Sequence, residues 1–388
     1  MNLQLTEEQE LVIAMVRRFV RDEILPLEYD LDPDADELDQ ADRARLIEKT
    51  KEMGLYGLDI PPAFGGPDID LVTRTLMAVE MAQHRAGLYA PCYGTFGGAG
   101  LAQLFEATEE QKEKYLYPTL RGEKRGFFGL SEPSGGSDPA RAIQTKAVQD
   151  GDDWIINGGK LWISGADKAQ YGLVFARTAN DKGRNGVTCF IVDTDTPGFA
   201  VRRIVHTLRS AHYATELSFD DMRVPASNIL GELNKGFAIA NDRLTKQRIP
   251  YAAGCIGVAI KAQEMALGYV PQRETFGAPL SSRQSIQWML VDNEIDIKQS
   301  LWVTLEAASK AQRGEPFRKE AAMAKLVATE AGGRVVDRCM QMFGGLGVAK
   351  DLPFERWFRE MRIRRIGEGP SEVQRHVIAR ELLGSSLR

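Results

Sequence analysis

The stretch Tyr171-Gly-Leu-Val-Phe-Ala-Arg177 lies near the middle of the chain and predicts a β-strand, because it is short, apolar and followed by the turn pair Lys182-Gly183. Similar segments flank it, separated by further turn pairs such as Asp150-Gly151 and Pro197-Gly198. These segments are rich in Val, Ile, Phe and Thr, and they cover residues 141–149, 153–157, 187–193, 199–204 and 214–219. The sequence therefore predicts an antiparallel β domain in the middle of the chain.

Apolar residues recur with helical spacing on both sides of this β region. Thr6 and Gln9 form a capping box for a first helix, which we expect to end at Pro26. Further helical patterns cover residues 41–53, 69–84 and 108–120, and from Gly236 the helical period continues to the C-terminus apart from turns at 275–284 and 343–353. We predict an α+β fold with three domains: N-terminal all-α (1–125), middle β (126–232) and C-terminal all-α (233–388).

Composition and charge exclude several classes of protein. The 388 residues are 43% hydrophobic and 27% charged, as in ordinary globular proteins, and they are numerous enough to bury a large ligand. The βαβ alternation of a doubly wound nucleotide-binding sheet is missing from the pattern. A net charge of −5, with basic residues interspersed among acids, argues against nucleic acid as a partner.

Cysteine spacing and the N-terminal sequence indicate the compartment. The four cysteines lie far apart and form no CxxC or Cys/His spacing, so we expect reduced thiols and no bound metal. Acidic residues occur within the first ten positions, and no apolar run approaches the roughly 20 residues of a membrane span. We therefore expect a cytoplasmic protein, although a processed organellar protein would have the same features.

A single carboxylate near the C-terminus is the candidate catalytic base. Glu368 lies on a turn between two glycines, and Pro370 and an amphipathic run follow it, which indicates an acid beside a helix N-terminus. The alternative is that Glu368 only stabilises the positive end of that helix.

Two segments of the β region could contact a ligand. The loop Phe127–Asp138 contains glycines and hydroxyls that could cradle an anion, or it is simply a solvated hairpin loop. In the segment Lys160–Gly165, Trp162 stands two residues before Ser164 and could stack on a planar ring, although a Trp in a β domain is more often a core residue.

Taken together, these segments resemble the acyl-CoA dehydrogenase family. The matching motifs are Ser131-Glu132-Pro133 with Gly136-Ser137-Asp138, Trp162-Ile163-Ser164, Arg273-Glu274-Thr275-Phe276-Gly277 with Gln284, Gln341-Met342-Phe343-Gly344-Gly345-Leu346-Gly347, and Gly367-Glu368-Gly369 with Gln374-Arg375. Pro61–Gly66 and Asp220–Pro225 extend the likeness over essentially the whole chain. The resemblance implies a helical domain, a β domain and a C-terminal four-helix bundle, with FAD as the cofactor and a homotetramer as the usual assembly.

The resemblance also implies roles for individual residues. Leu130, Ser131, Ser137, Trp162 and Ser164 would contact FAD, whereas Arg273, Gln284, Gln341 and Gly345 would hold the pyrophosphate and adenine of FAD bound mainly by a neighbouring subunit. Further candidate FAD contacts are Ile163, Thr275, Phe276, Gly344 and Ser371. A guanidinium such as that of Arg273 suits a pyrophosphate, because its planar fork pairs phosphate oxygens. Ser137, Thr245, Arg248 and Gly369 would contact the acyl-CoA substrate. For Arg248 the alternative is a surface ion-pair residue.

The implied reaction is α,β-dehydrogenation of an acyl-CoA thioester to the trans-2-enoyl-CoA. Glu368 would take the α proton, its backbone N–H would polarise the thioester carbonyl, and an electron-transferring flavoprotein would receive the electrons. Some family members place the base at the position of Gln247, and a glutamine cannot act as that base. This favours Glu368.

Some residues depart from the family pattern, which leaves alternatives open. Pro370 removes a hydroxyl and an N–H that could meet FAD, Pro139 is atypical, and Thr245 stands where many members carry Asp. The small-residue segment 93–100 could admit a wide or branched acyl group or could simply pack closely. A loop with His212 and Tyr213 could approach the substrate, or His212 is an ordinary loop histidine. Alternative functions are an oxygen-using acyl-CoA oxidase or nitroalkane-oxidase-like enzyme, or a non-catalytic assembly protein on the same fold.

Overall fold

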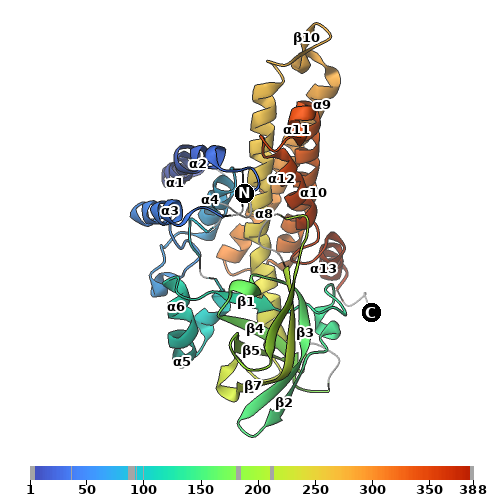
Figure 1. Ribbon diagram of the computed structural model, residues 1–388. Coiled ribbons are helices and arrows are strands. Elements are labelled where there is room, and N and C mark those ends of the chain that lie inside the picture. The colour runs from blue at the N-terminus through green and yellow to red at the C-terminus, as the bar shows by residue number, and fades with distance from the viewer. Residues whose placement is uncertain are drawn as a thin grey trace. The chain divides into compact units, whose positions relative to one another are not determined.

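The computed structural model (Figure 1) describes residues 5–35, 37–85, 92, 94–98, 100–180, 185–209 and 214–384. The chain forms two compact units, one of Met1–Gly97 with Thr245–Arg388 and one of Gly98–Leu244. The predicted boundaries at 125/126 and 232/233 stay predictions. None of the helices within the described ranges is long and apolar enough to cross a membrane.

The first helix begins as predicted but continues past Pro26. α1 (Glu7–Phe19) starts with the Thr6/Gln9 capping box. A wide turn, η1 (Val20–Ile24), follows, in which the Leu25 N–H reaches back to the Val20 carbonyl, and the chain then continues into α2 (Leu25–Asp30). Pro26 is tolerated because it falls in the first turn of α2, where its missing N–H has no helical partner to lose. The expected helix end at Pro26 is therefore wrong.

The other N-terminal helices match the predicted ones within a few residues. They are α3 (Gln40–Glu52) and α4 (Leu71–Met81), with the short turn η2 (Pro62–Phe64) between them. Asp70 caps α4 by accepting the N–H groups of Val72 and Thr73. Val16, Phe19, Leu46, Leu55 and Met77 form the small core that holds these helices together.

The second unit contains short helical turns and an eight-stranded sheet. The turns are η3 (Ala102–Glu106), α5 (Glu109–Gln111), η4 (Lys112–Leu116), α6 (Tyr117–Leu120), α7 (Pro139–Ala142), η5 (Ala166–Lys168) and η6 (Ala226–Asn228). The strands are β1 (Gly126–Gly129), β2 (Lys146–Asp150), β3 (Asp153–Ser164), β4 (Tyr171–Arg177), β5 (Val187–Asp193), β6 (Phe199–Val205), β7 (Ala214–Pro225) and β8 (Ile229–Leu230). The single helix expected over 108–120 is thus three consecutive pieces.

The sheet runs in the order β6-β7-β3-β2-β4-β5-β8, with β1 beside β4. Among the described strands every pairing is antiparallel except β1 with β4 and β2 with β4, which are parallel. The predicted strand 141–149 begins only at Lys146, because Pro139 starts the short helix α7. β4 and β5 are buried along almost their whole length, which explains their continuous apolar sequence.

Long helices form the C-terminal part of the first unit. They are α8 (Gly236–Tyr269), which belongs to this unit from Thr245 on, α9 (Gln284–Gln312) and α10 (Arg318–Phe343), followed by α11 (Gly345–Val348), α12 (Phe354–Arg364) and α13 (Ser371–Leu383). A hairpin of β9 (Glu274–Thr275) and β10 (Ala278–Pro279), followed by η7 (Leu280–Ser282), joins α8 to α9 and protrudes beyond the helix ends (Figure 1). The core between the helices is rich in alanine, so their backbones approach closely. At Gly257, for example, a Cβ atom would lie 2.1 Å from the Val79 carbonyl oxygen.

Candidate active site

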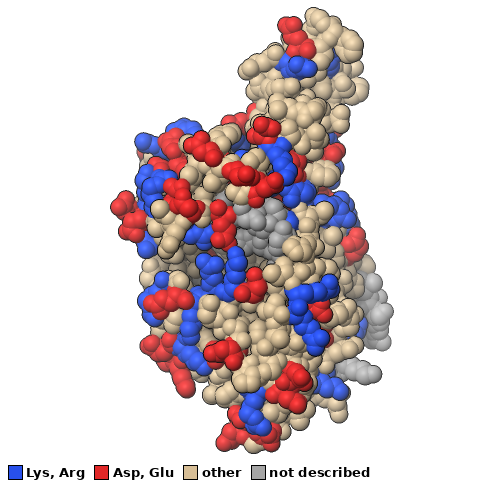
Figure 2. Space-filling view, viewed as in Figure 1, with Lys and Arg blue, Asp and Glu red and all other residues tan. Residues whose placement is uncertain are grey.

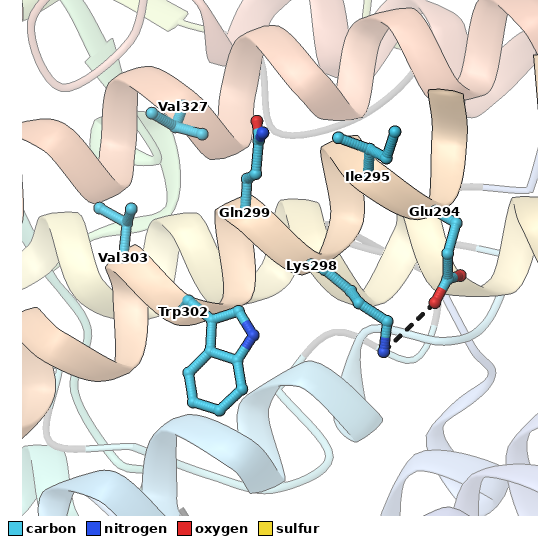
Figure 3. Close-up of a pocket in the computed structure, with 7 residues that line it drawn as sticks. All are labelled: Glu294, Ile295, Lys298, Gln299, Trp302, Val303 and Val327. Atoms are coloured by element: carbon cyan, nitrogen blue, oxygen red, sulfur yellow. Dashed lines mark ion pairs between the residues drawn. The ribbon is translucent and has the colours of Figure 1, made fainter. Parts of the chain in front are cut away.

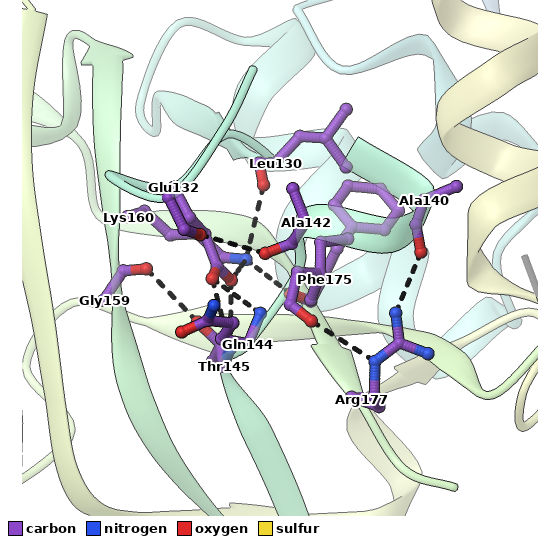
Figure 4. Close-up of polar contacts among 12 residues, drawn as sticks. Leu130, Glu132, Ala140, Ala142, Gln144, Thr145, Gly159, Lys160, Phe175 and Arg177 are labelled. Atoms are coloured by element: carbon purple, nitrogen blue, oxygen red, sulfur yellow. Dashed lines mark hydrogen bonds and ion pairs between the residues drawn. The ribbon is translucent and has the colours of Figure 1, made fainter. Parts of the chain in front are cut away.

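A buried ion pair anchors the loop that follows β1 (Figure 4). The Lys160 ammonium is fully buried and donates to Glu132 Oε1 at 2.7 Å and to the Phe175 carbonyl at 2.6 Å. The Glu132 carboxylate also accepts the N–H groups of Gln144 (2.7 Å) and Thr145 (3.1 Å). Burial alone would raise the pKa of Glu132, but the Lys160 charge and these hydrogen bonds lower it below its usual value. The carboxylate is therefore ionised and fixed.

The remainder of the loop is open to solvent. Ser134, Gly136, Ser137 and Asp138 are exposed, and Arg177 secures the α7 segment behind them through the Ala140 carbonyl at 2.9 Å. The loop thus has a rigid root at Glu132 and exposed hydroxyls and amides beyond it. The sequence does not indicate the Glu132–Lys160 pair, because no local pattern links two residues so far apart in the chain.

Trp162 projects from a bulge beside this loop. The register between β3 and β7 shifts between Leu161 and Ile163, and Trp162 in between has a positive φ of 67°. Its indole is 57% exposed, so the alternative of a core tryptophan is wrong. The Leu161 N–H donates to the Ser131 carbonyl at 3.0 Å, which places the bulge next to the loop. An exposed aromatic ring thus stands beside a hydroxyl-bearing, glycine-containing loop.

The other residues predicted around this site divide into buried and exposed ones. Leu130 and Ile163 are buried, and the Ile163 carbonyl accepts the Thr215 hydroxyl at 2.8 Å. Ser131 is half-buried and Ser164 is exposed. The exposed ring, hydroxyls and glycines fit a flavin, which requires a planar contact and donors along one edge.

The candidate base lies in a tight turn between α12 and α13. Glu368 is half-buried and has a φ of 55°, and Gly369 follows with a φ of 91°. A left-handed conformation at a non-glycine residue costs roughly 1–2 kcal/mol and is found mainly where surrounding structure imposes it. Of the five non-glycine residues with positive φ in the described ranges, Trp162, Phe276 and Glu368 are predicted site residues. Backbone strain therefore coincides with the predicted chemistry.

Two buried side chains hold this turn through its carbonyl groups. Lys325 Nζ and Gln374 Nε2 each donate to the Gly369 carbonyl at 2.8 Å. Gln374 Nε2 also approaches the Glu368 carbonyl at 3.3 Å. The α13 helix begins at Ser371, just after this turn, and the Ser371 hydroxyl donates to Glu330 Oε1 at 2.6 Å.

Buried cations surround the base turn. Arg248 on α8 is only 6% exposed, so the alternative of a surface ion-pair residue is wrong. Burial and the neighbouring Arg318 charge lower the pKa of Arg248 to about 10, and the Glu368 carboxylate opposes this effect. Its Nε and Nη1 atoms have no hydrogen-bond partner among the described residues. Burial also lowers the pKa of Lys325 to about 8.

Close packing explains the glycine that precedes the base. A Cβ atom at Gly367 would lie 2.7 Å from the Tyr251 hydroxyl oxygen. The Arg364 guanidinium in turn lies over the Tyr251 ring, with its carbon Cζ 4.2 Å from the ring centroid. The turn therefore approaches α8 closely only because position 367 lacks a side chain.

The protruding hairpin carries the residues predicted to hold a second FAD. Phe276 at its tip has a φ of 51° and is 99% exposed. Arg273 is exposed, and no hydrogen bond or ion pair among the described residues involves its side chain. Arg283, which the sequence did not single out, braces the hairpin by donating to the Thr275 carbonyl at 2.6 Å. A cation without an intramolecular partner fits a phosphate.

The turn after α10 lies near the base of this hairpin. The Tyr269 ring at the end of α8 stacks on Phe343 with centroids 4.1 Å apart, and the Arg273 N–H donates to the Tyr269 carbonyl. The other predicted members of the group, Gln284, Gln341, Gly344 and Gly345, are all exposed. The structure therefore groups the hairpin and the Gln341–Gly345 turn at one end of the helices.

The remaining predicted residues are placed as follows. Thr245 is buried on α8, and Gln247 is half-buried. Within the segment 93–100, residues 93 and 99 lie outside the described residues. A Cβ atom at Gly97 would lie 2.6 Å from ring carbons of Tyr56, which indicates close packing at this position. His212 and Tyr213 lie outside the described residues.

Comparison with known proteins identifies the family. The models for the N-terminal, middle and C-terminal domains of acyl-CoA dehydrogenases match residues 6–123, 127–222 and 234–383. The chain therefore belongs to the acyl-CoA dehydrogenase family, whose members are FAD-dependent oxidoreductases. The predicted resemblance and the order of helical, β and helical parts are confirmed.

Individual relatives match over nearly the whole chain. A probable acyl-CoA dehydrogenase of Bacillus subtilis (strain 168) is 39% identical, covering 99% of this chain and 100% of that protein. The short-chain-specific acyl-CoA dehydrogenase of Clostridium acetobutylicum is 38% identical (98% and 99% covered), and the NADH-dependent acryloyl-CoA reductase of Anaerotignum propionicum is 36% identical (99% and 96% covered).

Two solved structures share the fold. The butyryl-CoA dehydrogenase of Megasphaera elsdenii has a TM-score of 0.85 at 34% identity, covering 99% of this chain and 100% of that chain. A chain from the structural study of the electron transferring flavoprotein of Acidaminococcus fermentans has a TM-score of 0.85 at 33% identity, again covering 99% and 100%.

Proposed function

We propose that this protein catalyses the α,β-dehydrogenation of an acyl-CoA thioester to the trans-2-enoyl-CoA, with Glu368 as the base. The observation that carries the assignment to Glu368 is its strained, doubly clamped turn: a carboxylate with a φ of 55° beside buried cations. A helix-end acid with only a structural role needs neither the strain nor the cations.

Each residue of the proposed mechanism has a separate task. The Glu368 carboxylate takes the α proton, and the Glu368 backbone N–H donates to the thioester oxygen, where negative charge develops as the proton leaves. Arg248 and Lys325 are the buried cations beside the turn that carries this carboxylate. Bound FAD would supply the acceptor for the β hydride. Trp162 and the Leu130–Ser137 loop would hold the flavin ring, and Arg273 would pair with a phosphate of the FAD bound mainly by a neighbouring subunit.

Short acyl groups are the proposed substrates. The similarity to the short-chain-specific enzyme of C. acetobutylicum and to the butyryl-CoA dehydrogenase of M. elsdenii supports this choice. We also propose an electron-transferring flavoprotein as the electron acceptor, supported by the similarity to the chain from A. fermentans.

A homo-oligomer is part of the proposal. Trp288, Val291, Ile295 and Trp302 are exposed on α9 at spacings that place them along one helix face. Part of this face forms an open groove of about 540 Å³ (Figure 3), lined by Glu294, Ile295, Lys298, Gln299, Trp302, Val303 and Val327. The end that carries the hairpin is also mostly uncharged in Figure 2, whereas acidic and basic side chains are interspersed over most of the face drawn. A second copy covering these surfaces would bury both.

Anaerobic titration of the purified yellow protein with straight-chain acyl-CoA thioesters tests the function. We expect flavin absorption to bleach with short thioesters, and Glu368→Gln to retain FAD but lose bleaching. A Glu368→Gln variant with wild-type turnover would refute the assignment of the base. Rapid peroxide formation in air would favour an oxidase, and a protein unable to bind FAD would favour an assembly role.

Reduction of an enoyl thioester is a second candidate. The similarity to the acryloyl-CoA reductase of A. propionicum favours it, because the same residues would serve the reverse direction with Glu368 returning the proton. Mixing the chemically reduced protein with a short enoyl-CoA distinguishes the candidates. Faster flavin reoxidation than flavin reduction by the saturated thioester would favour the reductase.

A further inference from the structure

Lys325 is a buried cation that the mechanism above uses only as a charge. Its side chain, on α10, has no exposed surface, and among the described residues it forms no ion pair. Lys160, which is also fully buried, is paired with the Glu132 carboxylate at 2.7 Å. An ammonium buried without a carboxylate partner is costly, so its retention at position 325 requires an explanation other than ordinary packing.

Among the described residues, the Lys325 side chain forms its hydrogen bond to another element at the base turn. Its Nζ donates at 2.8 Å to the Gly369 carbonyl, one residue after Glu368. Gln374 Nε2 donates to the same oxygen, also at 2.8 Å, from the first turns of α13. One carbonyl of the turn is thereby held from two sides, by α10 and by α13.

Charged and titratable groups face Lys325 from each element packed against it. Burial is the largest cause that lowers the pKa of Lys325, and the Arg248 charge on α8 lowers it further. Cys255 on α8, Glu368 and Glu330 act in the opposite direction and raise the Lys325 pKa. The Tyr251 ring lies 5.8 Å from the ammonium. Among these groups, Glu368 is the carboxylate that belongs to the base turn, so Lys325 interacts with this turn through its charge as well as through its hydrogen bond.

The turn needs such support because two successive residues adopt left-handed conformations. The φ values of Glu368 and Gly369 are 55° and 91°, and an extended or right-handed backbone would point the Glu368 side chain elsewhere. A buried donor that grips the next carbonyl fixes the peptide plane and with it the direction of the carboxylate.

We propose that Lys325 is a positioning residue for Glu368, which it acts on by holding the Gly369 carbonyl and thereby the left-handed turn that aims the carboxylate at the α carbon of the substrate. This inference rests on the proposed function, in which Glu368 is the base. The competing role is purely structural: Lys325 would stabilise the helices and leave proton abstraction unaffected.

Deuterium uptake by a ligand that cannot be desaturated separates these roles. In methylthioacetyl-CoA a sulfur replaces the β carbon, so the ligand has acidic α protons but no β hydride to lose. The Glu368 carboxylate would take an α proton, exchange it with D₂O and return a deuteron, with no net oxidation or reduction. Mass spectrometry of the recovered ligand gives the exchange rate for the FAD-loaded protein.

Lys325→Met is the test variant and Thr329→Val the matched control. Met keeps the length and apolar stem of lysine but removes the charge and the donors. Thr329 is also fully buried on α10, one turn further on, and among the described residues its hydroxyl hydrogen-bonds only within that helix. The thermal midpoint, the FAD content and the ligand Kd are measured for both variants.

We expect Lys325→Met to lower the exchange rate by about 10- to 100-fold while its FAD content and ligand Kd stay at wild-type values, since small misplacements of a base slow reactions on this scale. Thr329→Val should exchange at the wild-type rate. A wild-type exchange rate in Lys325→Met would overturn the inference, as would an equal loss in Thr329→Val.

Glu368→Gln distinguishes failure of this inference from failure of the proposed function. If Glu368→Gln abolishes exchange and Lys325→Met does not slow it, only the role of Lys325 is wrong. If Glu368→Gln exchanges normally, the base assignment itself fails. If Lys325→Met does not bind FAD, Lys325→Gln, which keeps a neutral donor, is measured in the same way. Slowed exchange with a wild-type ligand Kd in Lys325→Gln supports the inference, and a wild-type exchange rate overturns it.

Discussion

Replacing Lys160 by methionine tests how the loop after β1 is held. The side chains of Lys160 and Glu132 are 0% and 4% exposed, and their charges lie 2.7 Å apart. In Lys160→Met the Glu132 carboxylate would remain buried, with backbone N–H donors but no counter-charge. Leaving one partner of a buried pair uncompensated costs about 3–5 kcal/mol, a large share of the roughly 5–15 kcal/mol that stabilises a typical protein.

The sign of the pH dependence that Glu132 contributes to stability should reverse in this variant. In the wild type the pKa of Glu132 is lowered, so its contribution to stability is present above its usual value of 4.5 and is lost as the pH falls through the lower folded-state pKa. Without Lys160, burial dominates and the folded-state pKa rises above the unfolded one. The Glu132 contribution to the stability of the variant is then present in acid and is lost as the pH rises through that raised pKa.

Urea unfolding at about pH 5 and about pH 7.5 measures both effects. Lys146→Met, which removes an exposed lysine from β2, is the control and should unfold like the wild type. The double variant Glu132→Gln/Lys160→Met should recover most of the loss, because a glutamine oxygen can still accept the Gln144 and Thr145 N–H groups. A single variant as stable as the control, or a double variant no better than the single one, would refute this account.

Three further predictions concern the base turn and the hairpin. Gly369→Ala should destabilise the protein by about 1–2 kcal/mol in urea unfolding, because a side chain at a φ of 91° is strained and its Cβ would lie 2.8 Å from Gln374 Nε2. The control Gly333→Ala, in open space on α10, should be neutral or stabilising, and equal effects of the two substitutions would contradict the strain argument. As the pH rises from 8 to 10.5, the free energy of unfolding of the wild type should increase by up to about 3 kcal/mol through Lys325, because in this range only the unfolded chain keeps the lysine proton. Lys325→Met should lack this increase, and identical pH profiles of the two proteins would disprove the argument. Arg273→Gln should weaken FAD binding about 10- to 100-fold by calorimetry, and unchanged affinity would exclude a phosphate contact.

Local patterns predicted most of the secondary structure. The change from helical to alternating period near Gly126, the Thr6/Gln9 capping box and the turn pairs are all signals within a few residues of one another. The errors arose where two signals competed. Pro26 reads as a helix end, yet the wide η1 turn lets the helix pass it, and residues 141–145 look like strand although Pro139 begins α7 instead.

The individual site residues were predictable only as members of motifs. Trp162 and Glu368 stood out because an aromatic residue and a lone carboxylate occur beside turns. Whether Trp162 was core or exposed depended on a bulge that shifts the register by one residue, which reverses the face a side chain points to. The sequence is equally compatible with Arg248 as a surface residue, and only the structure shows that it is buried among the helices.

The sequence by itself determined the order of helical and β parts, the family, and the positions of the loop, the hairpin and the carboxylate, because each depends on residues close together in the chain. Only the tertiary structure decided what holds them. Lys160 meets Glu132 across 28 residues, and Lys325 meets the Gly369 carbonyl across 44. Such pairs leave no local pattern, since burial and hydrogen bonding between distant segments depend on how the whole chain packs.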